Sequence, residues 1–519
     1  MDYIVTILNK IKAKFTDTRK AAFISAVVAG FLAHGYGMAN NYIYHDATIL
    51  NGLGITFGIG RWALAFSGML NDLFLGNYNL PFLNVVISIL FIALAAMKAV
   101  DILEVKRKAT AAIIGSLMVA YPVVTSSFAY NFTASYYFFA LFLVVWAVEI
   151  MKEACATEEK YPLKATYISA LLFAISAGYY QAYLSVAATL FVAIMMISLY
   201  RSDDKVADVF MRGVKYVVSL LAGFALYLVL NKIFMNFSTQ SVVSYQGADT
   251  LGKLEITKLP RKFIECYLHF FYIKWNGINV TKGMWALVIV AVLAAAIVIA
   301  KNFIKKEAPI ANKLLFLLLC AILPIAVNLE YLFSTNELYS VHTLMRYATA
   351  FVLIIPVVLI ESDRNIITNV SEMMVLALVV CYIFVNNVAY LKLNLVQEEM
   401  TSYLSVLQAR IESTEGYTDE TPVIFVGQFG IDDANLTKLT ETYPEIQFLG
   451  FEYDAQDLLN KESWIRYMRV HSGYEPVIGE MTGDILENEE YYYMTNYPDA
   501  NSVRFINGRI VVKFNEQNY

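Results

Sequence analysis

Residues 80–103 read LPFLNVVISILFIALAAMKAVDIL, and the basic triplet Lys106–Arg107–Lys108 follows closely behind them. A helix needs about 20 mostly apolar residues to cross the core of a bilayer. Short loops that are rich in Lys and Arg stay on the cytoplasmic side. This stretch therefore predicts a membrane-spanning helix whose carboxyl end faces the cytoplasm.

The same pattern recurs along the chain and predicts an α-helical polytopic membrane protein with about eleven spans. Residues 164–200 are too long for one crossing, so we expect two helices that meet near Gly178–Tyr179–Tyr180–Gln181. The predicted spans are residues 21–39, 80–103, 109–128, 133–152, the two helices within 164–200, 212–235, 284–303, 313–329, 347–360 and 373–391.

The composition agrees with a membrane protein. Hydrophobic residues make up 58% of the 519 residues and charged residues only 16%, whereas soluble domains carry about a quarter charged residues. The small net charge of −5 and the lack of a basic block exclude a typical nucleic-acid-binding protein. The four cysteines, Cys155, Cys266, Cys320 and Cys381, are scattered along the chain. Their spacing indicates no disulfide framework and no zinc site, so we expect no metal.

Basic residues predict the orientation of these spans. The N-terminus is basic and no small-residue cleavage site follows the first span, so we expect a retained anchor helix with a cytoplasmic N-terminus. Lys and Arg also follow spans two, four, six and eight, whereas the short loops on the other face contain almost none. Alternation over eleven spans then places the C-terminus on the extracytoplasmic side.

Two long outer loops, residues 40–79 and 236–283, each predict an amphipathic helix that lies in the membrane interface. Apolar and aromatic residues recur near helical spacing in both loops. They are Trp62, Leu64, Phe66, Met69 and Phe74 in the first loop, and Phe263, Tyr267, Phe270, Phe271 and Trp275 in the second. The simpler alternative is that these helices only plug the bundle.

The composition changes at Lys392, where acidic residues, Asn and Tyr become frequent and no further span appears. We expect residues 1–391 to form the transmembrane domain and residues 392–519 to form a small extracytoplasmic α/β domain. In this domain we expect a continuation of the last helix over 392–415, strands at 423–426 and 446–449, helices at 432–442 and 458–470, and a hairpin over 503–514 that turns at Asn507–Gly508.

The first outer loop holds the densest group of candidate functional residues. It carries His45–Asp46, glycines at positions 52, 54, 58 and 60, and then Arg61–Trp62. A carboxylate at the end of a membrane helix can act as a general base toward a hydroxyl nucleophile. An arginine can hold a phosphate through paired hydrogen bonds. The alternative is a solvated interfacial loop whose arginine contacts lipid headgroups.

Further candidates lie at the outer ends of later helices. Tyr121, Tyr180 and Gln181 offer the hydroxyl, amide and aromatic groups that suit sugar binding. Ionisable residues at a helix edge are costly unless they are paired, solvated or functional. Two residues of this kind, His342 and Arg346, are candidates for phosphate binding, and they follow Glu330–Tyr331 in the sequence. Lys274 in the second loop is a weaker candidate. The alternatives are ordinary interfacial aromatic residues and an arginine that reaches toward headgroups.

In this order, the motifs resemble the bacterial GtrII-type glucosyltransferases, which belong to the wider GT-C class of integral membrane enzymes. The resemblance covers roughly residues 21–391. It rests on His45–Asp46 with Gly60–Arg61–Trp62, on Ala120–Tyr121–Pro122, on Gly178–Tyr179–Tyr180–Gln181–Ala182 and on Met345–Arg346–Tyr347. The resemblance implies a GT-C-like transmembrane fold, and it does not extend to the soluble tail.

The resemblance also implies an activity. Enzymes of this kind move a sugar, here expected to be glucose, from a polyprenyl-phosphate carrier to a cell-surface glycan such as O-antigen or teichoic acid. They act outside the bacterial cytoplasmic membrane, usually invert the anomeric centre, and use the lipid-linked sugar as a substrate without a further cofactor. The partners expected for this chain are therefore the lipid-linked sugar, the glycan acceptor and membrane lipids.

Asp46 matches the catalytic acidic residue of the family, with Asp72 as the reserve. Many members carry two acidic residues near this position, whereas this chain has one that His45 precedes. The expected sugar- or acceptor-binding residues are His45, Trp62, Tyr121, Tyr180 and Gln181. The expected phosphate-binding residues are Arg61, Arg346, His342 and Lys274.

Three other functions stay open on the sequence alone. A lipid-linked glycan flippase or exporter would carry charged residues deep within several spans. Here the main carboxylate near a span is Glu149, close to the cytoplasmic end, while other ionisable residues gather at the outer rim. An outer-face glycan polymerase or ligase would use the same rim as a glycosyltransferase. A receptor whose tail binds a partner is the third alternative.

Overall fold

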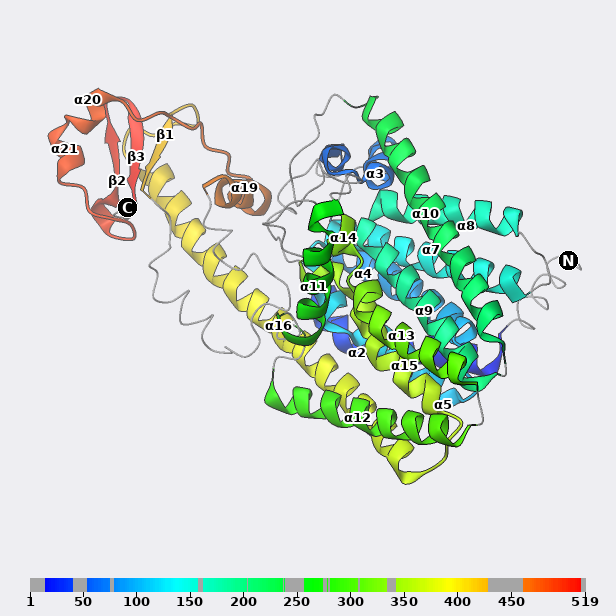
Figure 1. Ribbon diagram of the computed structural model, residues 1–519. Coiled ribbons are helices and arrows are strands. Elements are labelled where there is room, and N and C mark those ends of the chain that lie inside the picture. Colours follow the sequence, from blue (N-terminus) through cyan, green and yellow to red (C-terminus); the bar gives the residue numbers. More distant parts are fainter. Residues whose placement is uncertain are drawn as a thin grey trace, which may run out of the picture. The chain divides into compact units, whose positions relative to one another are not determined.

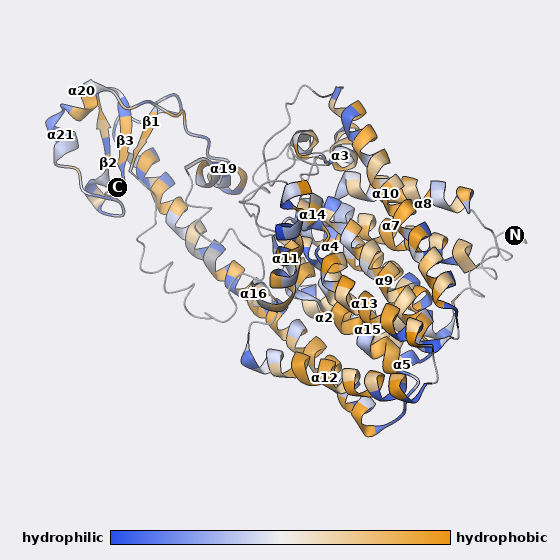
Figure 2. Cartoon of the chain, in the orientation of Figure 1, coloured by the Kyte–Doolittle hydropathy of each residue, from blue (hydrophilic) through white to orange (hydrophobic). Residues whose placement is uncertain are grey.

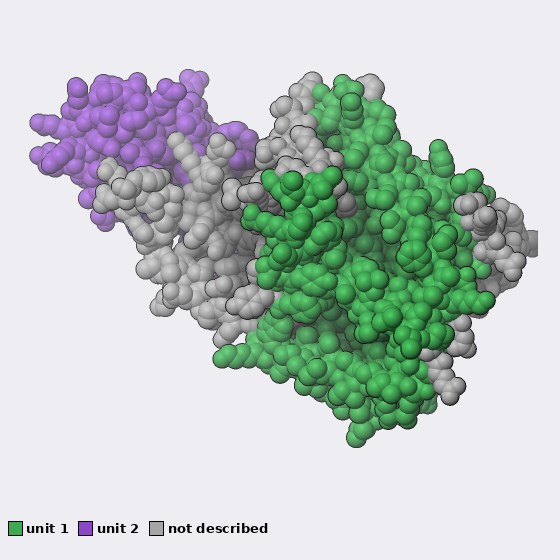
Figure 3. All heavy atoms as spheres, viewed as in Figure 1, with its two compact units in different colours: residues 1–39, 51–387 green, residues 40–50, 388–519 purple. Residues whose placement is uncertain are grey.

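The computed structural model describes residues 15–40, 54–74, 79–156, 162–202, 204–236, 238, 256–273, 278, 281–306, 309–333, 342–427 and 461–514. These residues are mostly helical (Figure 1). The chain divides into two compact units, Met1–Ala39 with Asn51–Asn387 and Asn40–Leu50 with Val388–Tyr519 (Figure 3).

Nine helices in the described part of the chain are long and apolar enough to cross a membrane. Each coincides with one of the predicted spans, because a long run of apolar residues is the strongest sequence signal for a membrane-spanning helix. They are α2 (Asp17–Ala39), α4 (Pro81–Ile102), α5 with α6 (Lys108–Ala120 and Pro122–Phe128), α7 (Asn131–Ala156), η3 with α9 (Gln181–Tyr183 and Leu184–Arg201), α10 (Val206–Asn236), α12 (Lys282–Lys305), α13 (Ile310–Val327) and α16 (Ile366–Ser413).

The two remaining predicted spans are shorter apolar helices. They are α8 (Leu163–Tyr179) and the pair η9 (Tyr347–Thr349) and α15 (Ala350–Ile360). The predicted break in the long apolar run is confirmed, because Tyr180 has extended backbone angles (φ −156°, ψ 105°) between α8 and η3.

Apolar residues dominate the sequence of the helices in the first unit (Figure 2). Three of these helices, α10, α12 and α13, expose large aliphatic side chains such as Leu221, Leu293 and Leu317. An exposed apolar face is what a membrane-spanning helix presents to lipid. The composition and surface of this unit therefore support a membrane-embedded protein.

Small residues let α2 pack closely against α4 and α5. The buried face of α2 contains Ala22, Ala26, Gly30 and Ala33. On α5, a Cβ atom at Gly115 would lie 2.1 Å from the carbonyl oxygen of Ala22. Small residues at such crossings are typical of helix packing in membranes, where dispersion contacts replace the hydrophobic effect.

The two long loops contain the predicted amphipathic helices. In the first loop, the short helix η2 (Gly54–Ile59) precedes α3 (Trp62–Phe74), and in the second, η5 (Ile256–Lys258) precedes α11 (Leu259–Leu268) and the π-helical turn η6 (His269–Ile273). Helix α3 buries Trp62 and Leu64 and exposes Leu73 and Phe74. The short helices α14 (Glu330–Phe333) and η8 (Thr343–Met345) follow α13 and precede η9.

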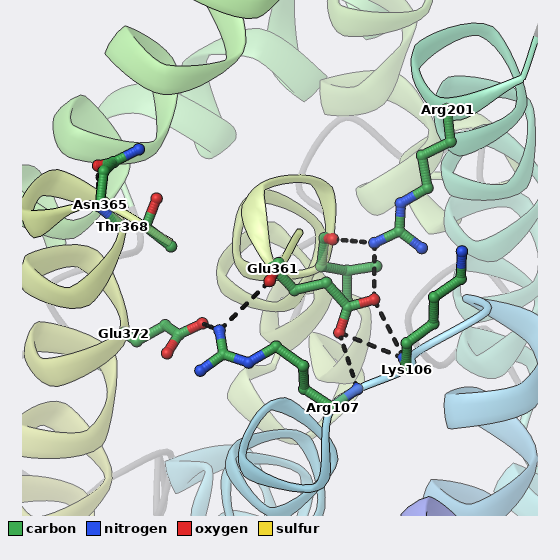
Figure 4. A network of polar contacts seen from close by, with 8 residues as sticks. Lys106, Arg107, Arg201, Glu361, Asn365, Thr368 and Glu372 are labelled. Carbon is green, nitrogen blue, oxygen red and sulfur yellow. Dashed lines mark hydrogen bonds and ion pairs between the residues drawn. The ribbon is translucent and has the colours of Figure 1, made fainter. Parts of the chain in front are cut away.

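One end of the bundle in the first unit is held by charged side chains, and we call it the basic end (Figure 4). The Glu361 carboxylate follows α15, is 1% exposed, and accepts hydrogen bonds from the backbone N–H groups of Lys106 and Arg107. The Arg201 guanidinium donates to the same carboxylate at 2.9 Å. Arg107 also forms an ion pair with Glu372 of α16. These contacts join the α4–α5 loop to the ends of α9, α15 and α16.

The second unit holds the last part of α16 and a three-stranded sheet. The strands are β1 (Val423–Val426), β2 (Val503–Ile506) and β3 (Arg509–Lys513), in the order β1-β3-β2, with β1 parallel and β2 antiparallel to β3. The helices of this unit are α19 (Lys461–Ser472), α20 (Gly483–Leu486), α21 (Glu489–Tyr492) and η10 (Ala500–Ser502).

Several predictions for this unit are confirmed. The hairpin turns at Asn507 and Gly508, which both have positive φ (48° and 80°), as an Asn-Gly turn of type I′ requires. The predicted strand at 423–426, the helix near 458–470 and the continuation of the last span are also present. The helix predicted at 432–442 and the strand predicted at 446–449 lie outside the described residues.

Candidate active site

The structure describes most, but not all, of the predicted site residues. His45, Asp46 and Lys274 lie outside the described residues. The described ones are Arg61, Trp62, Tyr121, Tyr180, Gln181, His342 and Arg346. The reserve residue Asp72 is exposed near the end of α3.

A tight turn positions Arg61. Gly60 has φ +78°, and a Cβ atom there would lie 2.6 Å from the Tyr227 hydroxyl oxygen, so this position requires glycine. The Tyr227 hydroxyl donates to the Gly60 carbonyl at 3.0 Å, and the Gln181 amide nitrogen donates to the Ile59 carbonyl at 3.0 Å. The amide nitrogen of Gln181 thus holds the loop that presents Arg61, and sugar binding by Gln181 stays a prediction.

The Arg61 guanidinium lies against two stacked tyrosine rings. It donates a hydrogen bond to the Tyr137 hydroxyl at 2.8 Å, and its central carbon is 4.9 Å from the centre of the Tyr180 ring. The two rings stack with centroids 4.4 Å apart. A guanidinium over aromatic faces is held by cation–π attraction in a fixed orientation. Tyr180 therefore contacts a phosphate-binding candidate.

Trp62 packs beside this arginine. Its ring is 7% exposed and stacks on Phe234 with centroids 4.8 Å apart. A Cβ atom at Gly178 would lie 2.5 Å from the indole, so glycine there makes room for the ring. The buried indole nitrogen has no hydrogen-bond partner within the described ranges. This indole N–H is available to donate to a ligand.

A row of tyrosines links Arg61 to Arg346, and we call this end of the bundle the tyrosine end. The Tyr180 and Tyr183 rings meet edge to face with centroids 5.2 Å apart, and Tyr183 meets Tyr347 in the same way at 6.0 Å. The structure thus brings together residues that the sequence places in three separate motifs.

Arg346 lies between η8 and η9 and is 1% exposed. Its guanidinium donates to the backbone carbonyl of His269 in η6 at 3.3 Å. Tyr121 joins the same region, because its hydroxyl is 2.7 Å from the Thr349 hydroxyl, which donates to the Arg346 carbonyl at 2.6 Å. His342 is also buried, immediately before η8.

Glu330 is a further buried residue near this site, and it is not among the site residues predicted from the sequence. It begins α14, beyond the end of the span α13, and is 5% exposed. Burial raises its pKa to about 7, although a backbone hydrogen bond, the charge of Arg346 and the Ser185 hydroxyl act in the opposite direction. A glutamate that follows an apolar run looks like a solvated interface residue, so the sequence gives no signal for this burial.

No group of three His, Cys, Asp or Glu side chains in the described part of the chain could hold a metal ion. The described site brings together two guanidinium groups, several tyrosine hydroxyls and one buried carboxyl. Guanidinium groups suit phosphate, and hydroxyl, carboxyl and aromatic groups suit sugars.

The comparisons with known proteins agree with this chemistry. Residues 35–357, well over half of the chain, match the family described as Glucosyl transferase GtrII. The match includes Arg61, the tyrosine row, Glu330 and Arg346. No curated protein and no solved structure matched the chain. The chain therefore belongs to the GtrII glucosyltransferase family, which makes it a membrane glycosyltransferase.

Proposed function

We propose that the protein transfers glucose from polyprenyl phosphate to a cell-surface glycan on the extracytoplasmic face of the bacterial cytoplasmic membrane. The observation that carries the proposal is the family match over residues 35–357, together with two arginines at the ends of one tyrosine row. A lipid-linked donor needs cationic groups for its phosphate and polar aromatic groups for its sugar, both at one end of the bundle.

The proposed topology has eleven crossings, a cytoplasmic N-terminus and an extracytoplasmic second unit. The contacts at the basic end support it, because several basic loops meet there. Lys152 of α7 donates to the Ile102 carbonyl, and Lys306 after α12 donates to the Ser202 carbonyl. If that end is cytoplasmic, the tyrosine end faces outward.

In the proposed reaction, the Asp46 carboxylate removes the proton from an acceptor hydroxyl. The hydroxyl oxygen attacks the anomeric carbon from the side opposite the phosphate, a carbon–oxygen bond forms, and the bond to the phosphate oxygen breaks. Polyprenyl phosphate leaves with the bonding electron pair, and the anomeric centre is inverted. Arg61 or Arg346 stabilises the negative charge that grows on the phosphate.

The other residues take supporting roles in the proposal. His45, Trp62 and Tyr121 contact the sugar or the acceptor, and His342 and Lys274 add to phosphate binding. The indole N–H of Trp62 and the Tyr183 hydroxyl support this assignment, because both are buried without a partner among the described residues. The C-terminal part of the second unit, residues 388–519, would assist recognition of the acceptor glycan.

The test is turnover by the purified protein in lipid nanodiscs. It is given a panel of polyprenyl-phosphate sugars and a glycan acceptor, and the released polyprenyl phosphate and the anomeric configuration of the product are measured. We expect release with the glucose donor and a product of inverted configuration. Release with none of the donors would contradict the proposal.

Two variants test the assigned roles. Asp46→Asn removes the general base, and Arg61→Gln removes the cation that would donate hydrogen bonds to the phosphate. We expect each variant to lower kcat about 100- to 1000-fold. The matched control is Asp208→Asn, an exposed carboxylate at the start of α10, which should retain full activity. Full activity of Asp46→Asn would contradict its role as the base.

The flippase alternative finds no support in the described spans. Glu149, the main carboxylate near a span, forms an ion pair with Lys98 and is largely buried. The charge of Glu149 is therefore balanced by a side chain of α4. An outer-face polymerase or ligase would be distinguished by its product, since it transfers a lipid-linked oligosaccharide in place of one sugar.

A further inference from the structure

Glu330 differs from the other buried acidic residues in the described part of the chain. Glu149, Glu361 and Glu372 each form an ion pair with a Lys or Arg side chain. Glu330 forms no such ion pair, and neither of its carboxylate oxygens makes a hydrogen bond of good geometry to a described residue, although its own backbone N–H and the Ser185 hydroxyl lie near enough to lower its pKa. Burial of a carboxyl group without a cation beside it costs free energy, and here burial outweighs these polar neighbours.

The surroundings of Glu330 are tightly built. The Asn328 amide nitrogen donates to the Cys266 carbonyl at 3.1 Å, which fixes α11 against the end of α13. The His269 ring stacks on the Tyr331 ring with centroids 4.4 Å apart. Because the Arg346 guanidinium donates to the His269 carbonyl, Arg346 and Glu330 border the same cluster. A rigid shell of this kind holds both charged groups in place.

Arg346 and Glu330 do not form an ion pair within 4.0 Å, although each lies near enough to influence the other electrostatically. A hydroxyl group can accept a hydrogen bond from the guanidinium and donate one to the carboxylate. A phosphate group only accepts hydrogen bonds and would be repelled by an ionised carboxylate. The pair is therefore better matched to a sugar hydroxyl than to a phosphate.

We propose that Glu330 and Arg346 form a sugar-hydroxyl subsite, in which the Glu330 carboxylate accepts a hydrogen bond from a hydroxyl of the donor sugar. Arg346 donates to the same hydroxyl or to its neighbour on the ring. Arg61, whose guanidinium is held against Tyr137 and Tyr180, is then left to bind the phosphate. This division of roles rests on the proposed function and makes Glu330 a specificity-determining residue.

The ionised form of Glu330 is the one that binds. Its pKa of about 7 means that raising the pH through neutrality increases the fraction of binding-competent protein. The titratable groups that face it are Arg346 and Cys266, and Lys262 and His269 contact the adjacent Tyr331. Burial raises the pKa of the Cys266 thiol to about 12, so this thiol stays neutral in the same range.

The test compares polyprenyl-phosphate glucose with its four deoxy analogues in nanodiscs. We expect wild-type protein to discriminate about 10- to 100-fold against one analogue, which lacks the bound hydroxyl. Glu330→Gln should lose a similar factor in kcat/KM with the parent donor, mainly through KM. The variant should turn over the discriminated deoxy analogue and the parent donor at similar rates. It should also lack the increase in kcat/KM that the wild type shows as the pH rises through 7.

The matched control is Glu265→Gln in α11, whose carboxylate forms a surface ion pair with Arg261. It should keep the wild-type discrimination and pH profile. Thermal unfolding of each variant shows that it is folded. Unchanged discrimination in a folded, active Glu330→Gln protein would overturn the inference alone. Wild-type protein that turns over no lipid-linked sugar would overturn the proposed function, and the inference with it.

Discussion

Buried carboxylates near the two ends of α15 differ in their hydrogen-bond partners. Glu361 directly follows this helix at the basic end, and its carboxylate accepts hydrogen bonds from Lys106, Arg107 and Arg201. At the tyrosine end, Arg346 directly precedes η9, and the carboxylate of nearby Glu330 forms neither an ion pair nor a hydrogen bond of good geometry with a described residue. About 20 Å of helix separates the two regions.

If the proposed function holds, the difference separates a structural role at the basic end from a binding role at the tyrosine end. Buried polar groups in folded proteins nearly always find partners, and the basic end follows this rule for its acidic residues. The carboxylate at the tyrosine end breaks the rule in a region that also holds a buried indole N–H without a partner. Groups left unsatisfied in the free protein are those that a polar ligand can satisfy.

The largest expected effect is at the basic end. Glu361→Ala removes the carboxylate that accepts hydrogen bonds from two backbone N–H groups and pairs with Arg201, which keeps only its backbone carbonyl acceptors. Removal of one partner from a buried ion pair costs about 3–5 kcal/mol. We expect a large fall in the thermal unfolding temperature in detergent. The exposed Glu153 of α7 provides the control variant Glu153→Gln, which should unfold like the wild type. An unchanged unfolding temperature for Glu361→Ala would show that the network has no structural role.

A smaller effect of opposite sign is expected at the tyrosine end. Because the pKa of Glu330 is raised from 4.5 to about 7 in the folded protein, ionisation destabilises the ligand-free protein as the pH rises from 4.5 to 7. The cost reaches about 3 kcal/mol above pH 7. Glu330→Gln removes it, so this variant should unfold at a higher temperature than the wild type at pH 8.

The stability difference should shrink as the pH falls from 7 and vanish below pH 4.5, where Glu330 is protonated in both the folded and the unfolded state. Thermal unfolding of wild type and variant across this pH range measures it. A lower unfolding temperature for Glu330→Gln at pH 8 would mean that the carboxylate is a structural group like Glu361, and the contrast between the two ends would collapse.

The smallest effect concerns the turn before Arg61. Gly60→Ala places a Cβ atom at positive φ and close to the Tyr227 hydroxyl, and we expect a stability loss of about 1–2 kcal/mol. Because the turn presents Arg61, KM for the donor should rise as well. Gly35→Ala in α2, where a Cβ atom meets nothing within 4 Å, should leave KM unchanged. Equal KM values for both variants would argue against a positioning role for the turn.

Much of the fold could be predicted from the sequence because its signals are local. Spans such as Pro81–Ile102 are long runs of apolar residues, and the hairpin at Asn507–Gly508 depends on two adjacent residues with positive φ. The partners of Arg61 could not be predicted in this way. Tyr137 lies 76 positions away on α7, and nothing local indicates that it meets the side chain of the residue before α3.

Glu330 shows the same limit in the candidate site. Its burial depends on α11 and η6, about 60 residues earlier, which pack against the end of α13 through Cys266, Asn328 and the His269 ring. From sequence alone, a glutamate after an apolar run belongs in water. Only tertiary packing turns it into a buried carboxyl beside an arginine.

Trp62 supplies the protein with a natural optical probe. Its indole is buried against Phe234, directly after the arginine that would meet the donor phosphate, and its N–H has no partner among the described residues. The emission of an indole shifts when its hydrogen bonding or the nearby charge changes. Donor binding can therefore be followed by intrinsic fluorescence, with a Trp62→Phe variant to identify the signal, and without any label on the lipid.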